Sequence, residues 1–409
     1  MKIIHTSDWH LGQHFMGKSR EPEHQAFLAW LLEQIKIHEV NALIIAGDVF
    51  DTGTPPSYAR KLYNDFIVAL QPLSCQLVVI GGNHDSVATL HESRELLSYL
   101  NCLVVGGTER NLKEQVQLLH DREGNPGAIL CAVPYLRPQE LVTSQAGESS
   151  DDKARTLSQA IAQHYATLYD FACRKRQELG KALPIIGTGH LMVLGGESSE
   201  SVRDIYIGTL AGFPAQFFPP MDYLALGHLH RGQTAGGQDH FRYSGSPIPL
   251  SFDEVKQTKQ VLLLDVDLDQ PIQIHSLSIP VFRKLATLKG KVSEIASQFN
   301  ALIQSEVSDF SVQPCWLEVE IQDNDYLNNI QSQLQTLCED HSIEVLRIKR
   351  QQQNIPELSS GVVKESLTEL TVEEVFQRRI QLENFEDETE KEQLTQLFKE
   401  IITTLSAET

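Results

Sequence analysis

Five short segments of the sequence carry side chains of the kind that bind divalent metal ions, and each segment follows an apolar run. The segments are Ser7-Asp8-Trp9-His10, Gly47-Asp48-Val49-Phe50-Asp51, Gly82-Asn83-His84-Asp85, Gly189-His190 and Gly227-His228-Leu229-His230. Carboxylate oxygens bridge hard cations, and imidazole nitrogens suit Mn, Fe or Zn. Two divalent cations roughly 3.5–4 Å apart clamp a phosphate and ionise a water between them. The residue types therefore predict phosphoester hydrolysis at a centre with two metal ions.

No single segment is a strong signal. Asp-x-His and Gly-Asn-His-Asp are common surface turns when they occur alone, and an isolated histidine such as His190 is usually a satisfied structural residue. The pair His228 and His230 is more specific, because alternate residues of an extended segment point to one face. The prediction depends on the five segments together, each directly after a predicted strand. The carboxyl ends of such strands share one edge of an α/β sheet, where sites are built.

The elements that must position these segments are short strands that alternate with helices. We expect strands at 2–6, 42–46, 77–80, 103–105, 128–133, 185–188, 223–226 and 260–266. We expect helices at 21–38, 57–70, 86–99 and 154–180. The alternation predicts an α/β fold over residues 1–278, a β-sandwich flanked by helices.

A second, smaller domain is expected at 279–350, after a boundary at Ile279-Pro280. Its predicted order is strand 282–288, helix 292–304, strand 316–321, helix 326–339 and strand 343–349, which makes a small α+β domain. Residues 351–409 begin with a polar linker and continue with amphipathic helices at 371–383 and 388–405. The apolar stripe of each of these helices favours binding to a partner, and folding back onto the same chain is the alternative.

The composition is that of a globular protein with an acidic balance of charge. The 409 residues are 41% hydrophobic and 22% charged, and the formal net charge is −20. The apolar runs are too short to span a bilayer and no secretory signal is visible, so we expect a soluble, cytoplasmic protein without a membrane partner. Six scattered cysteines without a Cys-x-x-Cys pair predict free thiols. The acidic charge is usually a matter of solubility. Because phosphate contacts need Lys and Arg, a chain of this charge that bound a nucleic acid would need a partner to supply much of the binding surface.

The five segments, in this order, resemble the motifs of the calcineurin-like metallophosphoesterase superfamily. Further similarity lies in residues 1–12, in Tyr243-Ser244-Gly245-Ser246-Pro247 and in Thr371-Val372-Glu373-Glu374-Val375-Phe376. These segments resemble the nuclease subunits of bacterial ATPase–nuclease complexes. The resemblance covers nearly the whole chain and is strongest over residues 1–255. Nothing is transferred from it to residues 144–183.

The resemblance assigns metal-binding roles to the residues of the five segments. It implies two metal sites that share the Asp48 carboxylate as a bridge. The first site would be formed by Asp8, His10, Asp48 and His230, and the second by Asp48, Asn83, His190 and His228. Oxygen and nitrogen ligands without a cysteine fit Mn²⁺ best, with Mg²⁺ or Fe²⁺ as alternatives.

Three further residues receive roles beside the metals. The resemblance implies that His84 is a catalytic residue rather than a ligand, which contacts the scissile phosphate and helps the leaving oxygen depart, while Asp85 orients its ring. A histidine charged by a neighbouring carboxylate can donate a proton or stabilise the transition-state phosphate. We expect Asp51 to contact a metal ligand and to orient it.

The resemblance implies that the substrate is DNA. It implies 3′→5′ exonuclease action on duplex ends and endonuclease action on hairpins or single strands, in DNA end processing, recombination and repair. The 279–350 domain resembles the cap of the family, which grips duplex DNA. Candidate DNA contacts are His14, Arg20, Lys284, Lys289, Lys291, Arg347, Lys349 and Arg350.

The resemblance also implies partners. An ATPase subunit would be bound by the helices of residues 351–409, and the chain would form a homodimer through helices 57–70 and 86–99 within a heterotetramer.

Two other functions compete with this one. The chain could be a small-molecule phosphodiesterase or phosphatase with the same centre, or a non-catalytic scaffold of the ATPase, although a scaffold predicts missing ligands and all seven candidates are present.

Overall fold

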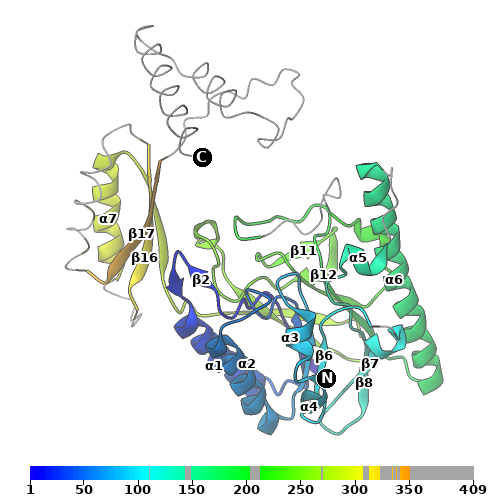
Figure 1. Ribbon diagram of the computed structural model, residues 1–409. Helices are drawn as coiled ribbons and strands as arrows, with labels where there is room; N and C mark the ends of the chain where they lie inside the picture. The colour runs from blue at the N-terminus through cyan, green and yellow to red at the C-terminus, as the bar shows by residue number, and fades with distance from the viewer. Residues whose placement is uncertain are drawn as a thin grey trace, which may run out of the picture. The chain divides into compact units, whose positions relative to one another are not determined.

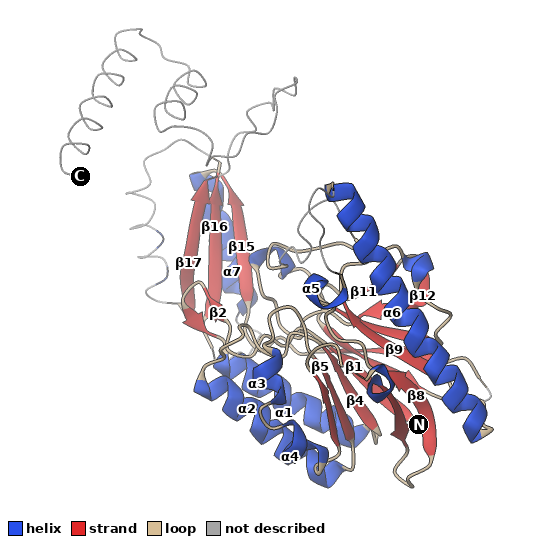
Figure 2. Ribbon diagram, turned by 45° about the vertical axis from the view of Figure 1, so that its right-hand side comes forward, coloured by secondary structure: helices blue, strands red, loops and turns tan. Residues whose placement is uncertain are grey.

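The computed structural model describes residues 1–350 except 110, 143–148, 203–211, 269, 307–312, 323–333, 335–337 and 339–340. The first compact unit of the chain spans Met1–Gln351. Its described part contains two six-stranded sheets, a three-stranded sheet and a short hairpin of β2 (His14–Phe15) and β3 (Lys18–Ser19). Figures 1 and 2 show these sheets and the helices that cover them.

The first six-stranded sheet mixes parallel and antiparallel pairs. Its order is β14 (Gln273–Ser278), β13 (Gln260–Asp265), β1 (Lys2–Thr6), β4 (Ala42–Ala46), β5 (Gln76–Ile80) and β6 (Cys102–Val105). The four strands from β1 to β6 in this order are parallel to one another. The loops that leave β1, β4 and β5 therefore emerge at the same edge of the sheet.

The second six-stranded sheet lies against the first. Its order is β11 (Gln233–Ala235), β12 (Gln238–Tyr243), β10 (Tyr223–Gly227), β9 (Ile185–His190), β8 (Pro126–Cys131) and β7 (Val116–His120). Strands β8, β9 and β10 are parallel, so the loops after β9 and β10 also share an edge.

The strands are apolar on both faces because each sheet is covered twice. In β1, Ile4 packs toward α1 (Glu21–Ile37) and α2 (Ser57–Leu70), and Ile3 packs in the core between the two sheets. Helix α6 (Ser150–Leu179) covers the outer face of the second sheet (Figure 2). The result is four layers, helix–sheet–sheet–helix, which confirms the predicted α/β sandwich.

A smaller parallel sheet follows in the same compact unit. Its order is β15 (Leu285–Gly290), β16 (Cys315–Ile321) and β17 (Ile343–Arg350), and α7 (Val292–Glu306) packs on one face over its own apolar core. We call this part the cap sheet. At its other face Trp316 stacks on Phe15 with ring centroids 5.7 Å apart.

Most of the predicted elements are present, with ends that differ by a few residues. The predicted helix 86–99 is wrong as one element, because it consists of two short helices, α3 (Val87–His91) and α4 (Arg94–Ser98). The sequence reading missed β7, β11, β12 and β14. In β14 the residues are mostly exposed, so the strand has no apolar run to reveal it. The predicted helices 371–383 and 388–405 lie outside the described residues, as does most of 326–339. No described helix is long and apolar enough to cross a membrane.

Candidate metal centre

The backbone at the shared edge is bent sharply so that side chains can converge. Asp8, His10 and Asp48 have φ values of 54°, 47° and 50°, in the left-handed region that residues other than glycine rarely adopt. Such a conformation costs about 1–3 kcal/mol and persists where the surroundings impose it, commonly at functional sites. Here the loops hold one another, since the His10 amide donates to the Asp48 carbonyl at 3.0 Å.

Glycines beside the polar residues permit the close approach of side chains from other loops. A Cβ atom on Gly47 would lie 2.0 Å from His190 Nδ1, and one on Gly82 would lie 2.1 Å from Asp48 Oδ1. Any larger residue at either position would displace a candidate ligand. Gly47 and Gly82 are therefore explained by space, and Gly47 also by its φ of 96°, which glycine adopts readily.

The structure brings the seven candidate ligands together from loops that are far apart in sequence. In each of three groups of residues, the possible ligand atoms lie within 4.8 Å of one another. The groups are Asp8, His10 and His230; His10, Asp48 and His84; and Asp8, Asp48 and His190. The amide oxygen of Asn83 lies 2.9 Å from His190 Nε2 and 3.2 Å from His228 Nδ1. The Asp48 carboxylate belongs to two of these groups.

The electrostatics of Asp48 depend on imidazoles. Its Oδ2 lies 3.2 Å from His190 Nε2 and 3.7 Å from His10 Nε2, and the carboxylate is buried. Burial alone would raise the pKa of Asp48, but the His190 and His10 rings hold it well below its usual range. Burial lowers the pKa of His190, yet Asp48 outweighs this and raises it to about 9. In the protein alone, the imidazoles supply the positive charge that the carboxylate needs.

This donor set fits divalent cations. It consists of buried carboxylates, one amide oxygen and imidazoles, which together suit a metal of intermediate hardness. Burial and the nearby His190 hold the pKa of His228 well below its usual range, so His228 stays neutral, the form in which imidazole binds metal. A bound cation would take over the compensating charge that the imidazoles supply to Asp48.

Each of three candidate histidine ligands has a partner for the nitrogen that faces away from the centre. His10 Nδ1 lies 3.2 Å from Asp51 Oδ1, and His190 Nδ1 lies 3.0 Å from the Ala46 carbonyl. His230 Nδ1 lies 2.6 Å from Ser201 Oγ. Such partners fix the orientation of the ring and leave Nε2 for a metal. Asp51 thus lies beside His10, and its role in orienting a metal ligand stays a prediction.

His84 and Asp85 differ from the expectation in how they are held. The Asp85 carboxylate accepts hydrogen bonds from the backbone amides of Val49, Phe50 and Gly82 at 2.9–3.1 Å, so it braces two loops. His84 Nδ1 lies 2.7 Å from the Asp51 carbonyl, to which it donates. The expectation that Asp85 orients the His84 ring is therefore wrong, because the carboxylate is turned toward backbone amides and a carbonyl orients the ring. Burial and the nearby Asp48 raise the pKa of Asp85 to about 6.

Arg20 is not available to DNA. Its side chain is 1% exposed, its Nε lies 3.1 Å from Glu23 Oε1, and it donates to the Pro249 carbonyl at 2.9 Å. Its guanidinium also lies over the Trp316 ring of the cap sheet. The expectation that Arg20 contacts DNA is wrong, because the residue joins the sandwich to the cap sheet. The sequence could not reveal this, since a buried and an exposed arginine look alike there.

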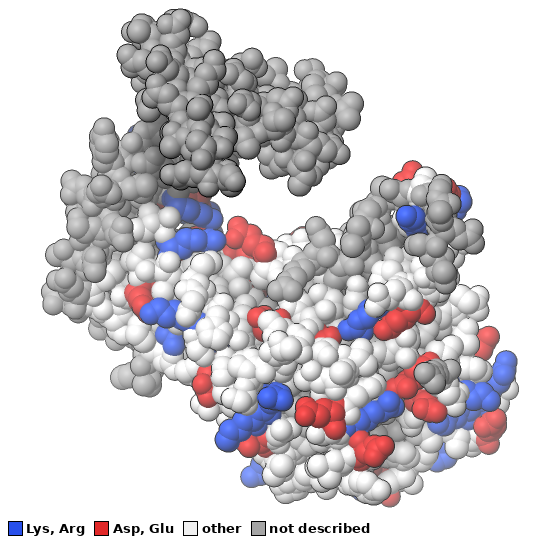
Figure 3. Space-filling model, viewed as in Figure 1, with Lys and Arg blue, Asp and Glu red and all other residues white. Residues whose placement is uncertain are grey.

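The other candidate DNA contacts are placed differently. His14 and Lys291 are exposed, and Lys284 is half-buried. Lys289 Nζ lies 2.7 Å from Glu320 Oε2, and Lys349 Nζ lies 3.5 Å from Glu318 Oε2. On the face shown in Figure 3, basic and acidic side chains of the described residues are interspersed, and these residues form no continuous basic stripe there.

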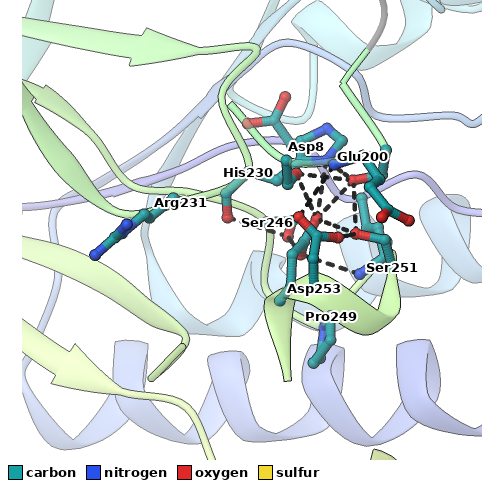
Figure 4. Close-up of polar contacts among 12 residues, drawn as sticks. Asp8, Glu200, His230, Arg231, Ser246, Pro249, Ser251 and Asp253 are labelled. Atoms are coloured by element: carbon teal, nitrogen blue, oxygen red, sulfur yellow. Dashed lines mark hydrogen bonds and ion pairs between the residues drawn. The ribbon is translucent and has the colours of Figure 1, made fainter. Parts of the chain in front are cut away.

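Sequence reasoning missed a buried polar cluster behind His230. Its centre is Glu254, which is fully buried beside Lys259, and it includes Ser201, Ser246 and Ser251. Figure 4 shows this cluster packed against His230. The nearest signal in the sequence was the Ser-Gly-Ser-Pro motif that contains Ser246. Glu254 stands among charged and polar residues such as Asp253 and Lys256, so its sequence is that of a surface segment.

Two family models match the chain. One, described as calcineurin-like phosphoesterase, matches residues 1–232, and the other, described as type 5 capsule protein repressor C-terminal domain, matches residues 281–384. The first spans more than half of the chain and contains all five segments. Together with two stacked sheets and an Asp/His cluster at their common edge, this match defines the class of the protein as a metallophosphoesterase.

Curated relatives define the class further. The chain is 49% identical over 409 residues to the SbcD subunit of the SbcCD nuclease of Escherichia coli (strain K12), and the match covers 100% of this chain and 99% of the relative. It is 36% identical over 275 residues to the protein of the same name from Rhodobacter capsulatus, covering 65% of this chain and 66% of that one. The chain belongs to the calcineurin-like phosphoesterases and, within them, to the SbcD nuclease subunits. This confirms the enzyme class that the sequence predicted.

Proposed function

We propose that the chain is a metal-dependent DNA nuclease whose centre holds two divalent cations, with Mn²⁺ as the preferred metal. The observation that carries the proposal is the position of Asp48, whose carboxylate lies beside His10 of one proposed site and beside His190 of the other, at 3.7 and 3.2 Å. Asp8, His10 and His230 would complete one site, and Asn83, His190 and His228 the other. A pair of cations supplies a nucleophilic water and compensates the charge of the phosphate.

The residues of the chain have separate tasks in this proposal. The Asp51 and Ala46 contacts orient the rings of His10 and His190 before any substrate binds. His84 donates through Nδ1 to the Asp51 carbonyl, and its Nε2 would act on a phosphate oxygen or on the leaving oxygen. Asp85 would act on the loops, since its carboxylate ties the backbone after β4 to the backbone after β5.

DNA is the proposed substrate for two reasons. The relatives at 49% and 36% identity are named as nucleases. The cap sheet presents Lys289, Arg347 and Lys349 on the face away from α7, and Arg347 also lies 3.5 Å from Glu200 of the sandwich. We propose 3′→5′ exonuclease action on duplex ends and endonuclease action on hairpins and single strands.

The proposed partner is the ATPase subunit SbcC, because the relatives are named as the SbcD component of an SbcCD nuclease. Residues 351–409 would bind it, and two copies of each chain would assemble as a heterotetramer with the nuclease subunits paired through α2, α3 and α4. Three large apolar side chains there, Val68, Leu96 and Tyr99, are 65–88% exposed, which supports an interface. The proposed domain limits are 1–278, 279–350 and 351–409.

One assay tests the proposal. Labelled hairpin and blunt duplex DNA, together with a small phosphodiester, would be incubated with the chain in Mn²⁺ or Mg²⁺, with and without SbcC and ATP. We expect Mn²⁺-dependent cleavage of DNA, with long duplexes degraded only when SbcC and ATP are present. Cleavage of the small diester without cleavage of any DNA would favour a small-molecule phosphodiesterase. Failure to bind any divalent cation would favour the scaffold.

A further inference from the structure

The polar cluster behind His230 is built around one buried carboxylate. Oε1 of Glu254 accepts hydrogen bonds from Ser199 at 2.7 Å, Ser201 at 2.5 Å and Ser251 at 3.1 Å. Its other oxygen, Oε2, accepts from Lys259 Nζ at 2.7 Å and from the Leu250 amide at 3.1 Å.

Lys259 joins this carboxylate to the backbone of a candidate metal ligand. Its ammonium is buried and donates to the His230 carbonyl at 2.9 Å and to Ser246 Oγ at 2.9 Å, as well as to Glu254. The side chain and the backbone of His230 are therefore both held by the Glu254–Lys259 pair. Figure 4 shows His230 and Ser246 beside this network.

The network has a defined direction. A carboxylate only accepts, whereas a serine hydroxyl has a single proton to donate. Ser201 donates that proton to Glu254, so it must accept from His230 Nδ1, 2.6 Å away. His230 therefore carries its proton on Nδ1, and Nε2 keeps the lone pair that a cation requires.

We propose that Glu254 is a positioning residue that, with Lys259 and through Ser201, fixes the tautomer of His230 and so selects the nitrogen that binds metal. The inference deepens the proposed function and rests on it. Its chemistry differs from that of two other candidate ligands, since His190 donates to a backbone carbonyl and His10 contacts a carboxylate directly. Of these three histidines, His230 is the one whose Nδ1 has a hydroxyl as its nearest partner, Ser201 Oγ at 2.6 Å, with Glu254 Oε1 farther away at 3.4 Å. Neighbouring groups can reverse the direction of such a hydroxyl.

The variant Glu254→Gln tests the direction of the network. The amide keeps the size of the side chain, and the charge of Lys259 draws the amide oxygen toward the ammonium. The amide NH2 group then faces the serines and donates to Ser201, which must donate to His230 Nδ1 instead. The ring proton moves to Nε2, and the lone pair turns away from the metal.

The measurement is the affinity for Mn²⁺ alone, by calorimetry or by the electron paramagnetic resonance of free Mn²⁺. We expect wild-type protein to bind two ions and Glu254→Gln to bind one of them about 10–100-fold more weakly, as is typical when the partner of a ligand is lost. Lys259→Met added to Glu254→Gln should restore part of the affinity, because the amide oxygen can then turn to Ser201. Ser201→Ala should weaken the same ion to a smaller extent.

The matched control is Glu23→Gln, which alters a carboxylate that is equally buried and ion-paired but distant from His230 in the network. It should leave both affinities unchanged while it lowers thermal stability. The inference is overturned if folded Glu254→Gln and Ser201→Ala both bind two ions as wild type does, or if the double variant binds no better than Glu254→Gln. Wild-type protein that binds no Mn²⁺ would overturn the proposed function itself, and this inference with it.

Discussion

Two regions of the molecule bury carboxylates to the same degree, but different groups compensate the negative charge in each. At the metal centre, Asp48 is 1% exposed and its ion pairs among the described residues are with His10 and His190. At the junction with the cap sheet, Glu23 is also 1% exposed but lies between the guanidinium groups of Arg20 and Arg283. Burial of an acid alone therefore does not indicate a binding site.

The two regions differ in whether the side chains around the carboxylate are charged permanently. Arginine is always charged, so the charge of Glu23 is compensated in the protein alone. Imidazole carries a charge only when it is protonated, so the charge at Asp48 is balanced only while His190 or His10 holds the additional proton. We therefore expect the junction to stabilise the fold, and the proposed centre to release protons when cations bind.

The largest expected effect comes from removing the shared carboxylate. Asp48→Asn keeps the shape of the side chain but removes the charge that both proposed sites use. We expect this variant to lose both Mn²⁺ ions and all DNA cleavage above background, as measured by Mn²⁺ titration and by the hairpin assay. Retention of one tightly bound ion would show that Asp48 serves a single site and would contradict the bridging role.

His84→Ala should separate metal binding from catalysis. The ring is anchored by the Asp51 carbonyl and is not among the proposed ligands. Loss of a group that acts on the leaving oxygen typically costs about 10²–10⁴-fold in rate. We expect a loss of that size in single-turnover cleavage, with two Mn²⁺ ions still bound. Wild-type turnover by this variant would remove His84 from the mechanism.

Glu23→Gln should lower the stability of the fold and leave metal binding unchanged. Removing one partner of a buried ion pair leaves an uncompensated charge, and here two arginines would lose their carboxylate. We expect the free energy of unfolding to fall by about 3–5 kcal/mol, as measured by urea denaturation without metal. Lys61→Ala is the surface comparison, since the Lys61–Asp65 pair is well exposed and should contribute at most about 0.5 kcal/mol. A similar loss from both variants would mean that the junction is no more than a surface pair.

A third kind of buried group is a base that stays neutral. Burial lowers the pKa of His164, on α6, to about 4, and its Nε2 has no hydrogen-bond partner among the described residues. Between about pH 6.5 and 4 the unfolded chain binds a proton that the folded one does not, so stability falls as the pH falls through this window. The slope from one such group is at most about 1.4 kcal/mol per pH unit. His164→Gln should flatten the dependence of unfolding free energy on pH in metal-free protein, and an unchanged slope would contradict the assignment.

The sequence predicted the centre better than its surroundings, and the reason is physical. The seven candidate ligands follow parallel strands whose apolar runs are easy to recognise, and parallel strands deliver their loops to one edge. Asp85, Arg20 and Glu254 were misread or missed because their roles depend on contacts with distant residues. Arg20, for example, reaches Pro249 and Trp316, and nothing in its local sequence separates this from a DNA contact. Strand β14 escaped notice because its exposed face carries no apolar pattern.

The smallest expected effects concern the cap sheet, where a lysine paired with a carboxylate can be compared with an exposed lysine. Lys289 pairs with Glu320 at 2.7 Å, and this bond raises the pKa of Lys289, whereas Lys291 is exposed and has no carboxylate partner among the described residues. A lysine whose charge is already compensated releases fewer counterions from DNA. Lys291→Ala should therefore weaken duplex binding and reduce the magnitude of the slope of log affinity against log salt by about 1. Lys289→Ala should change both the affinity and the slope less. Lys61→Ala, on α2, serves as the control. Equal effects of Lys289→Ala and Lys291→Ala would show that the Glu320 pair opens on binding and that both cations face phosphate.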